Sequence, residues 1–458
     1  MELSARELAA AIGGHVAAGA PDARASAWSI DSRLAGPGTC FFAVRGARDG
    51  HDFVADAFAR GATISVVADD VPAVRGATLI RVPRSGDALS EAGRYARTRL
   101  GHATVVGITG SAGKTATKDL TAAALAGSRR VHASPGSYNN EVGLPLTLLG
   151  APETADVVVT EMGARFEGNI ADLAAIARPA VGVVTHVGMA HSEHLGGRTG
   201  IARVKGELLE SLPGDGLAVL NAACDASAGL ATRTAAAVIL VGRDPGVDIR
   251  ISDVELDDEL RPRFTLETSW GTAPVILGLR GEQQVENAAM AAGVALWLGA
   301  PFEIVVAGLR DASGTSLRME LVRTADGVTI INDAYNSSPT SAAAAVRSLA
   351  NLRVGGRRVA VLGEMLELGP DTAAEHEAIG ALAGAAGIDL LVAVGQPASA
   401  LAAGARGTAL VVRAVPDAAA AAALLADQVR PGDAVLVKAS RAVGLERVAD
   451  ELVKGHAS

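Results

Sequence analysis

Apolar runs rich in Val, Ile and Thr recur along the chain and alternate with Ala-rich segments of helical composition. From residue 103 to about 315 this alternation is typical of βαβ units, so it predicts an α/β fold with a mostly parallel sheet. Residues 249–279 differ, because polar and apolar positions alternate there and predict antiparallel strands. After about residue 316 the α/β rhythm resumes and predicts a second doubly wound unit. The strands expected in these two parts cover residues 104–108, 156–160, 181–185, 217–220, 328–331, 358–362, 390–394 and 434–437.

The first hundred residues follow a less regular pattern of short apolar runs and short helical segments. Strands are expected at 40–44 and 63–68, and helices at 53–60 and 90–100. Further on, helices are expected at 285–298 and 418–426. A chain of 458 residues corresponds to about three domains of ordinary size. We expect domain bounds at 1–100, 101–315 and 316–458.

A glycine-rich turn follows the first strand of the central part, and a helical segment begins directly after it. Such a turn presents backbone N–H groups at a helix N-terminus, where the helix dipole also favours anions. Lys114 can reach the β- and γ-phosphates of a nucleotide, and the Thr115 hydroxyl can bind Mg²⁺. The spacing departs from the common phosphate-loop pattern, because Ile108 stands where that pattern has its first glycine. The turn predicts an ATP site formed by Gly110, Ser111, Ala112, Gly113, Lys114 and Thr115.

Polar residues follow two other predicted strands of the central sheet. Glu161 ends the strand at 156–160, and His191 lies in the loop after the strand at 181–185. Each residue alone is more often a surface carboxylate or a solvated loop histidine. Ligands bind at the carboxyl ends of parallel strands, so both residues together favour a position near the triphosphate.

Lys205 is notable because the chain has 41 Lys and Arg residues in total, of which only five are lysines. An amine can react with CO₂ to form a carbamate, whereas a guanidinium cannot, and the reaction requires a neutral amine with a lowered pKa. The alternative is an ordinary salt bridge, for example with Glu161 or Glu207. The five lysines are Lys114, Lys118, Lys205, Lys438 and Lys454.

Composition narrows the class of protein. The net charge of −9 argues against non-specific nucleic-acid binding. Two cysteines cannot form a disulfide framework, which favours a reducing compartment. No uncharged apolar stretch is long enough to predict membrane insertion, and the N-terminal residues are typical of a helix rather than of a signal peptide. We therefore expect a cytoplasmic protein, which we take to be a monomer.

Motifs along the whole chain resemble the Mur ligase family, the ATP-dependent amide-forming enzymes of peptidoglycan precursor synthesis. The turn GITGSAGKT, the loop THVGMAHSEHLGG (185–197) and the run VKGELLESL (204–212) occur in the family's order. The segments NDAYN (332–336) and LGEMLELG (362–369) are most similar to the branch that adds D-alanyl-D-alanine to a UDP-MurNAc-tripeptide. The resemblance implies a three-domain architecture with a central P-loop domain and a C-terminal Rossmann-like domain.

The resemblance also implies ligands for two metal ions. Thr115 and Glu161 match ligands of Mg²⁺, His191 matches a ligand of a second cation, and Lys205 matches the family's carbamylated lysine. An imidazole ligand is unusual for Mg²⁺ and suits Mn²⁺ well. With Lys114, the residues Lys205, Glu161 and His191 form the catalytic set that the resemblance implies.

For the substrates, the resemblance implies one set of residues in each part of the chain. Asn287 and Arg318 match contacts to the nucleotide, and Asp333 and Asn336 match a loop of the C-terminal domain that faces it. Asn140 matches a polar loop near the γ-phosphate and the acceptor carboxylate. The uridine diphosphate part matches Ser32, Arg33, Gly46, Asp49 and His51.

These features imply a ligase that joins D-Ala-D-Ala to UDP-MurNAc-tripeptide through an acyl phosphate. The loop Arg165 to Ile170 departs from the family pattern, so a ligase of the same build that uses another carboxylate and amine stays open. A P-loop ATPase without ligation is a third alternative, and amine-dependent release of phosphate would separate it from either ligase.

Overall fold

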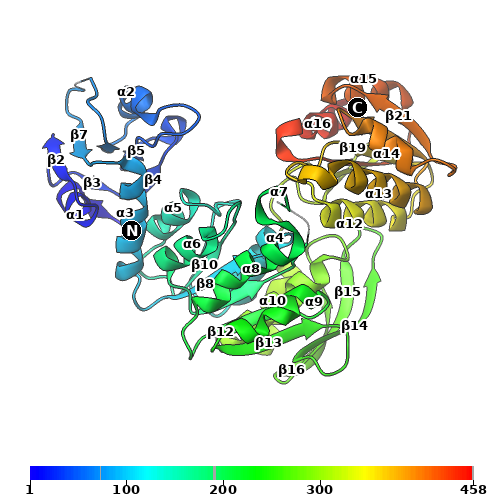
Figure 1. Cartoon of the computed structure of the whole chain (residues 1–458), viewed down its shortest axis with the longest axis horizontal. Coiled ribbons are helices and arrows are strands. Elements are labelled where there is room, and N and C mark those ends of the chain that lie inside the picture. The colour runs from blue at the N-terminus through cyan, green and yellow to red at the C-terminus, as the bar shows by residue number, and fades with distance from the viewer. Residues whose placement is uncertain (73, 189–191, 456–458) are drawn as a thin grey trace.

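The computed structural model describes residues 1–72, 74–188 and 192–455. Figure 1 shows three groups of elements in chain order, with the N-terminal and C-terminal groups on opposite sides of a central one. We call them the N-terminal region (1–100), the central region (101–315) and the C-terminal region (316–458). Among the described residues, none of the helices combines the length and the apolar character needed to cross a bilayer.

The N-terminal region contains a five-stranded sheet in the order β2-β7-β6-β5-β4, in which only β2 runs antiparallel to its neighbour. A two-stranded ribbon, β1-β3, lies beside it. Helix α3 (Ser85–Arg99) of this region leads into the central region and begins five residues before the helix predicted at 90–100. The other elements are β1 (Leu3–Ser4), α1 (Ala5–Ala11), β2 (His15–Ala18), β3 (Arg24–Ala25), β4 (Ala27–Ser29), η1 (Ser32–Leu34), β5 (Thr39–Phe42), η2 (Gly50–Phe53), α2 (Val54–Ala59), β6 (Ile64–Val67) and β7 (Thr78–Arg81).

The central region is built on a nine-stranded sheet in the order β16-β15-β14-β13-β12-β11-β8-β10-β9. All pairs from β9 to β14 are parallel, and β15 and β16 are antiparallel, as the alternating pattern at 249–279 predicts. β8 lies between β10 and β11, so the carboxyl ends of these three strands meet at one edge. The strands are β8 (Thr104–Thr109), β9 (Val131–Ala133), β10 (Val157–Glu161), β11 (Val181–Val184), β12 (Leu217–Asn221), β13 (Ala237–Gly242), β14 (Ile249–Leu256), β15 (Pro262–Thr268) and β16 (Gly271–Ile276).

Helices cover both faces of this sheet because successive side chains of its strands point to opposite sides. Val105 of β8 packs in one apolar cluster with α3, α5, α6 and α8, whereas Val106 packs in a second with α4, α10 and α11. These runs contain no polar alternation because both faces are buried. The helices are α4 (Lys114–Ala126), α5 (Gly143–Gly150), α6 (Asn169–Ala177), α7 (Ser192–Leu195), α8 (Gly197–Glu210), α9 (Asp225–Ala228), η3 (Gly229–Arg233), α10 (Gln284–Trp297) and α11 (Phe302–Asp311).

The C-terminal region contains a six-stranded sheet in the order β17-β18-β22-β19-β20-β21, parallel except for β17. The predicted α/β fold with two largely parallel sheets is thus confirmed, although β17 and β21 were not predicted. The elements are β17 (Glu320–Arg323), β18 (Thr329–Asn332), α12 (Pro339–Asn351), β19 (Arg358–Leu362), η4 (Gly369–Asp371), α13 (Thr372–Ala385), β20 (Leu390–Val394), α14 (Ala398–Gly404), β21 (Val411–Val415), α15 (Ala418–Gln428), β22 (Ala434–Lys438), η5 (Arg441–Val443) and α16 (Glu446–Gly455).

Candidate active site

The predicted phosphate loop lies between β8 and the first turn of α4. Gly110 and Gly113 have φ angles of 150° and 84°. A Cβ atom at Gly110 would stand 2.0 Å from Thr185 Oγ1, and one at Gly113 would stand 2.5 Å from Asn287 Oδ1. Only glycine fits at these two positions. The loop is held from β11, because the Thr185 hydroxyl donates to Ala112 O at 2.5 Å, and the α4 N-terminus is left available for an anion.

Thr115 and Glu161 form a buried, hydrogen-bonded pair at this loop. The Thr115 hydroxyl donates to Glu161 Oε2 at 2.8 Å, and the two residues are 2% and 1% exposed. The Asn139 amide donates to the other carboxylate oxygen, Oε1, at 2.8 Å. A hydroxyl and a carboxylate in this position suit Mg²⁺, which prefers oxygen ligands. His191, the expected ligand of the second cation, lies outside the described residues.

Lys205 is buried on α8, with 1% of its surface exposed. Burial, helped by the charge of Lys114 and opposed by the carboxylates of Glu207 and Glu161, lowers the pKa of its ammonium group to about 7. The expected salt-bridge alternative is not found, since no ion pair within 4.0 Å joins Lys205 to Glu161 or Glu207 in the described structure. Glu207 instead accepts hydrogen bonds from Gly168 N at 2.8 Å and Ala171 N at 3.0 Å. An amine that is partly neutral at physiological pH suits carbamate formation.

Lys114 is the positive group closest to the expected phosphates. Its Nζ donates to Gly110 O at 2.8 Å, so in this structure it folds back over its own loop. Burial lowers the pKa of Lys114, Glu161 opposes the shift, and Arg318 adds to it. A triphosphate would supply the negative charge that this buried cation lacks.

The residues expected to contact the nucleotide approach the phosphate loop from two regions. Asn287, on α10, lies against Gly113 and donates to Gln284 Oε1 at 2.9 Å. Arg318 is in the segment that enters the C-terminal region, and its guanidinium lies 4.2 Å from the centre of the Tyr335 ring. Arg318 Nε is buried and has no hydrogen-bond partner among the described residues, as expected for a group that meets a ligand.

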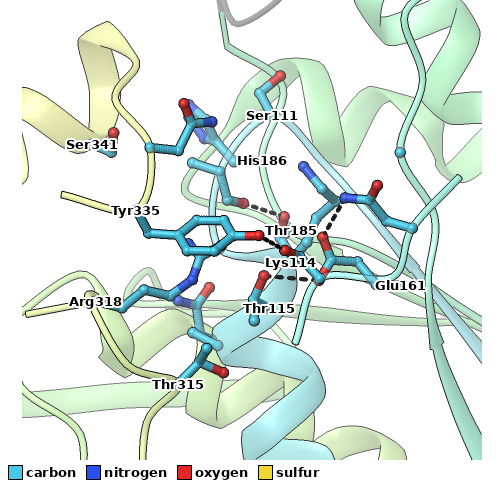
Figure 2. A pocket seen from close by; sticks show the side chains of 18 of the residues that line it. Ser111, Lys114, Thr115, Glu161, Thr185, His186, Thr315, Arg318, Tyr335 and Ser341 are labelled. Atoms are coloured by element: carbon cyan, nitrogen blue, oxygen red, sulfur yellow. Dashed lines mark hydrogen bonds between the residues drawn. The ribbon is translucent and has the colours of Figure 1, made fainter. Parts of the chain in front are cut away.

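The loop after β18 brings the C-terminal region to the same place. Asp333 pairs with Lys438 Nζ at 2.6 Å, and Lys438 also donates to Asn336 O at 2.8 Å. Figure 2 shows Tyr335 projecting toward Lys114, Thr115 and Glu161. Its hydroxyl is hydrogen-bonded to that of Ser137, in the central region. Sequence reasoning gave no role to Ser137, Asn139 or Lys118, although the scarcity of lysine was a signal for Lys118.

One cavity of about 1360 Å³ joins these groups. Its wall includes Arg94 of α3, Lys114 and Glu161 of the central region, and Tyr335 and Arg347 of the C-terminal region. Gly110 and Lys205 lie behind the wall rather than in it. The other expected residues of the central and C-terminal regions in the wall are Ser111, Ala112, Gly113, Thr115, Asn140, Asn287, Arg318, Asp333 and Asn336.

The expected residues of the N-terminal region are not in this wall, and they gather at the start of α2. The short helices that carry them, η1 and η2, both contact α2. Ser32 donates to Asp56 Oδ2 at 2.7 Å, and the exposed Arg33 pairs with Asp31 at 2.6 Å. The charge of Arg48, in the loop that begins at Gly46, helps to lower the pKa of Asp31, so the two segments lie close together.

Asp49, His51 and Asp69 form a small cluster in the same place. His51 Nε2 accepts from Ala68 N at 2.9 Å, so Nδ1 carries the proton and donates to Asp49 Oδ1 at 2.6 Å. With both ring nitrogens used, the cluster does not suit a metal ion. It fixes the shape of the loop from Gly46 to His51.

Comparisons with known proteins agree with this arrangement over the length of the chain. Residues 108–295 match the Mur ligase middle domain, and residues 317–441 match the Mur ligase, glutamate ligase domain. The chain is 42% identical to the UDP-N-acetylmuramoyl-tripeptide--D-alanyl-D-alanine ligase of Mycobacterium tuberculosis, covering 99% of this chain and 98% of that protein.

Solved structures give the same result. MurF from Acinetobacter baumannii superposes with a TM-score of 0.88 at 30% identity, covering 99% of both chains. The MurF ligase of Thermotoga maritima in complex with ADP has a TM-score of 0.79 at 31% identity, covering 94% of this chain and 97% of that one. Because sequence and fold agree from end to end with such enzymes, the resemblance expected from the motifs is confirmed, and the chain belongs to the Mur ligase family.

Proposed function

We propose that this protein is an ATP-dependent ligase that joins D-Ala-D-Ala to the terminal carboxylate of UDP-MurNAc-tripeptide. The observation that carries the proposal is the cavity whose wall draws on all three regions and contains the phosphate loop. This reaction brings three substrates together, and around the shared cavity each region would bind one of them. The full-length similarity to UDP-N-acetylmuramoyl-tripeptide--D-alanyl-D-alanine ligases supports the choice of substrates.

In the first step, a carboxylate oxygen of the peptide attacks the γ-phosphorus of ATP, and the bond to ADP breaks. The products are an acyl phosphate and ADP. The N–H groups at the start of α4 hold the phosphates, and Lys114 neutralises the charge that develops on the transferred group. Thr115 and Glu161 would hold Mg²⁺, which would supply positive charge to stabilise the transferred phosphoryl group. Lys205, as a carbamate, would add an anionic ligand, together with His191 for a second cation.

In the second step, the amino group of the dipeptide attacks the acyl carbon. A C–N bond forms, the C–O bond to phosphate breaks, and the nitrogen loses a proton, so amide and inorganic phosphate are released. The acyl phosphate is sensitive to hydrolysis, and approach of the C-terminal region would exclude water from it. In this scheme residues 1–100 bind the UDP-sugar part, residues 101–315 bind ATP, and residues 316–458 bind the amine.

The set at the start of α2 is proposed as the uridine diphosphate site. Ser32, Arg33 and the loop from Gly46 to His51 converge there, and Arg48 adds a cation without a carboxylate partner within 4.0 Å among the described residues. Asn140 Oδ1 accepts from Gly143 N, the first residue of α5, at 2.9 Å. Its NH₂ group has no hydrogen-bond partner among the described residues, so it would be available to the acceptor carboxylate or the γ-phosphate in the cavity.

The test is incubation of the pure protein with ATP, Mg²⁺, UDP-MurNAc-tripeptide and D-Ala-D-Ala, followed by mass analysis of the product. We expect amide, ADP and phosphate in equal amounts, and slow ATP turnover when the dipeptide is omitted. Product formed only with another amine or carboxylate would indicate a ligase of the same build with different substrates. Fast phosphate release without any amine would indicate an ATPase and contradict the proposal.

A further inference from the structure

Lys118 is a buried lysine that the phosphate-loop chemistry leaves unexplained. It lies one turn after Lys114 on α4 and is 3% exposed. Its Nζ donates hydrogen bonds to Ser134 O and Gly136 O at 2.8 Å each, and it forms an ion pair with Asp119 Oδ1 at 2.9 Å. Burying a charge is costly even when it is paired, and an apolar side chain could fill the same space. The ammonium group is therefore expected to do more than fill the core.

The two carbonyl groups that Lys118 binds belong to the segment 134–140, which also sets the position of Glu161. Ser134 Oγ accepts from Glu161 N at 3.3 Å, and the Asn139 amide donates to Glu161 Oε1 at 2.8 Å. Asn139 O accepts from Gly163 N at 2.7 Å, two residues after Glu161. Lys118 thus holds the segment that orients Glu161 toward Thr115.

Asp119 and the segment 134–140 are contacted at two points from the side of the C-terminal region. Thr315, in the segment that leads to that region, donates to Asp119 Oδ2 at 2.7 Å. Tyr335, on its nucleotide-facing loop, is hydrogen-bonded to Ser137 of the segment 134–140. The contact of Thr315, at the junction with the C-terminal region, therefore ends on Asp119, and the contact of Tyr335 ends on the segment that Lys118 holds.

We propose that Lys118 and Asp119 form a positioning pair that links the placement of the C-terminal region to the geometry of the Thr115–Glu161 metal site. When Thr315 and Tyr335 are in place, Asp119 and the segment 134–140 are fixed, and Asn139 keeps Glu161 aligned. The proposal rests on the ligase function proposed above. It predicts that loss of the pair weakens Mg²⁺ binding as well as turnover, whereas a purely structural role would lower stability alone.

The experiment compares Lys118→Met, Asp119→Ala and Thr315→Val with Thr121→Val. Thr121 is a matched control because it is buried on α4 and donates only within the helix, to Thr117 O at 2.7 Å. Calorimetric titration of ADP over a series of Mg²⁺ concentrations gives the Mg²⁺ requirement without relying on activity. Loss of a partner that orients a metal ligand commonly costs about 10–100-fold in metal affinity or activity. We expect at least about a tenfold higher Mg²⁺ requirement and a similar fall in kcat for Lys118→Met, and changes within about twofold for Thr121→Val.

The link to the C-terminal region is tested by a double-mutant cycle. Asp119→Ala combined with Thr315→Val should be no worse than Asp119→Ala alone, since both remove one interaction. Additive losses, or an unchanged Mg²⁺ requirement in a folded Lys118→Met protein, would overturn the inference. If Lys118→Met does not fold by circular dichroism, the Asp119 and Thr315 cycle decides. A wild type that binds ADP with Mg²⁺ but forms no amide would contradict the proposed function, and the binding titration would still test the pair.

Discussion

The central region joins its two neighbours in different ways. On the N-terminal side, α3 belongs to the same apolar cluster as α5 and α6, so Leu89 and Ala96 share a core with Leu148 and Ile176. Gly93 brings the helices so close that a Cβ atom there would stand 2.8 Å from Pro145 Cβ. Tyr95 of α3 packs against the same cluster, and Arg97 Nε donates across to Ala177 O of α6 at 2.8 Å.

On the C-terminal side the contacts are mainly polar and surround the cavity. Arg165 pairs with Glu367 at 3.4 Å, the Tyr335 hydroxyl bonds to Ser137, and Thr315, at the junction of the two regions, donates to Asp119. Leu260 adds an apolar contact, since it packs in the core cluster of the C-terminal region. A shared core holds two regions in a fixed relative position, whereas a small polar interface allows them to separate and rejoin. We call the shared core on the N-terminal side the apolar joint and the polar interface on the C-terminal side the polar joint. The difference indicates that the N-terminal and central regions stay together while the C-terminal region moves.

The largest effect is expected when the positive charge of Lys114 is removed from the cavity beside the polar joint. Lys114→Ala should lower the rate of amide formation about 100-fold or more, on the order of 3 kcal/mol, because its charge acts on the transferred phosphoryl group. Steady-state rates at saturating ATP measure the effect, and the exposed Lys454→Ala is the control. Near-normal turnover would place the chemistry elsewhere.

Lys205 extends this test to a residue behind the cavity wall. Lys205→Ala and Lys205→Arg should both lose nearly all amide formation, because neither can form a carbamate. Short-chain carboxylates added to Lys205→Ala should restore part of the rate by supplying the missing anion. An active Lys205→Arg protein would show that positive charge is what the site needs.

The apolar joint is tested with the same substitution at two places on α3. Gly93→Ala should lower the free energy of unfolding by about 1–3 kcal/mol, because the new methyl group overlaps Pro145. Gly86→Ala, where nothing lies within 4 Å of the new atom, should leave it unchanged or raise it by up to about 1 kcal/mol. Urea denaturation measures both. Equal changes in the free energy of unfolding for the two variants would mean that α3 does not pack closely against the central region.

His376, in the C-terminal region, is expected to make the free energy of unfolding depend on pH. His376 Nε2 accepts from Met365 N at 2.9 Å, so the neutral ring holds the loop that carries Glu367. Burial lowers the pKa of His376, partly opposed by its bond to Thr372 O and by Glu364 and Glu375.

The sign follows from the lowered pKa, since the unfolded chain takes up a proton near its usual pKa of about 6.5 and the folded protein does so only at lower pH. The contribution of neutral His376 to the free energy of unfolding is full above about pH 6.5. It is lost as the pH falls toward the pKa of His376 in the folded protein, with a slope of at most about 1.4 kcal/mol per pH unit. Urea midpoints at several pH values should fall less steeply for His376→Gln than for wild type. The exposed His102→Gln should behave as wild type, and identical slopes for all three proteins would contradict the assignment.

The smallest effect is expected at the ion pair between Arg165 and Glu367. Their side chains are 68% and 28% exposed, and exposed pairs contribute about 0–1 kcal/mol. Arg165→Ala should shift the free energy of unfolding by less than about 1 kcal/mol, as Arg60→Ala should at the exposed pair with Asp56. A loss of several kcal/mol in urea denaturation would mean that the polar joint is as rigid as the apolar one.

Local patterns predicted most of the fold. The run at 156–160 became β10 because a strand buried on both faces needs a continuous apolar sequence. β21 was missed because it is an edge strand, half exposed and interrupted by Arg413. The neighbourhood of Lys114, Thr115 and Glu161 followed from a local motif and the strand-end rule. The contacts of Thr315 with Asp119 and of Tyr335 with Ser137 span 196 and 198 residues, and no local pattern encodes them.

The positions of the tyrosines give the molecule its own spectroscopic labels. The sequence has three: Tyr95 is at the apolar joint, Tyr335 is at the polar joint, and Tyr138 is on the segment 134–140, 40% exposed. Incorporation of 3-fluorotyrosine would therefore give one ¹⁹F resonance for each joint and one for the loop beside the metal site. During a titration with nucleotide and peptide, the Tyr335 signal would report opening and closing while the Tyr95 signal served as the internal reference.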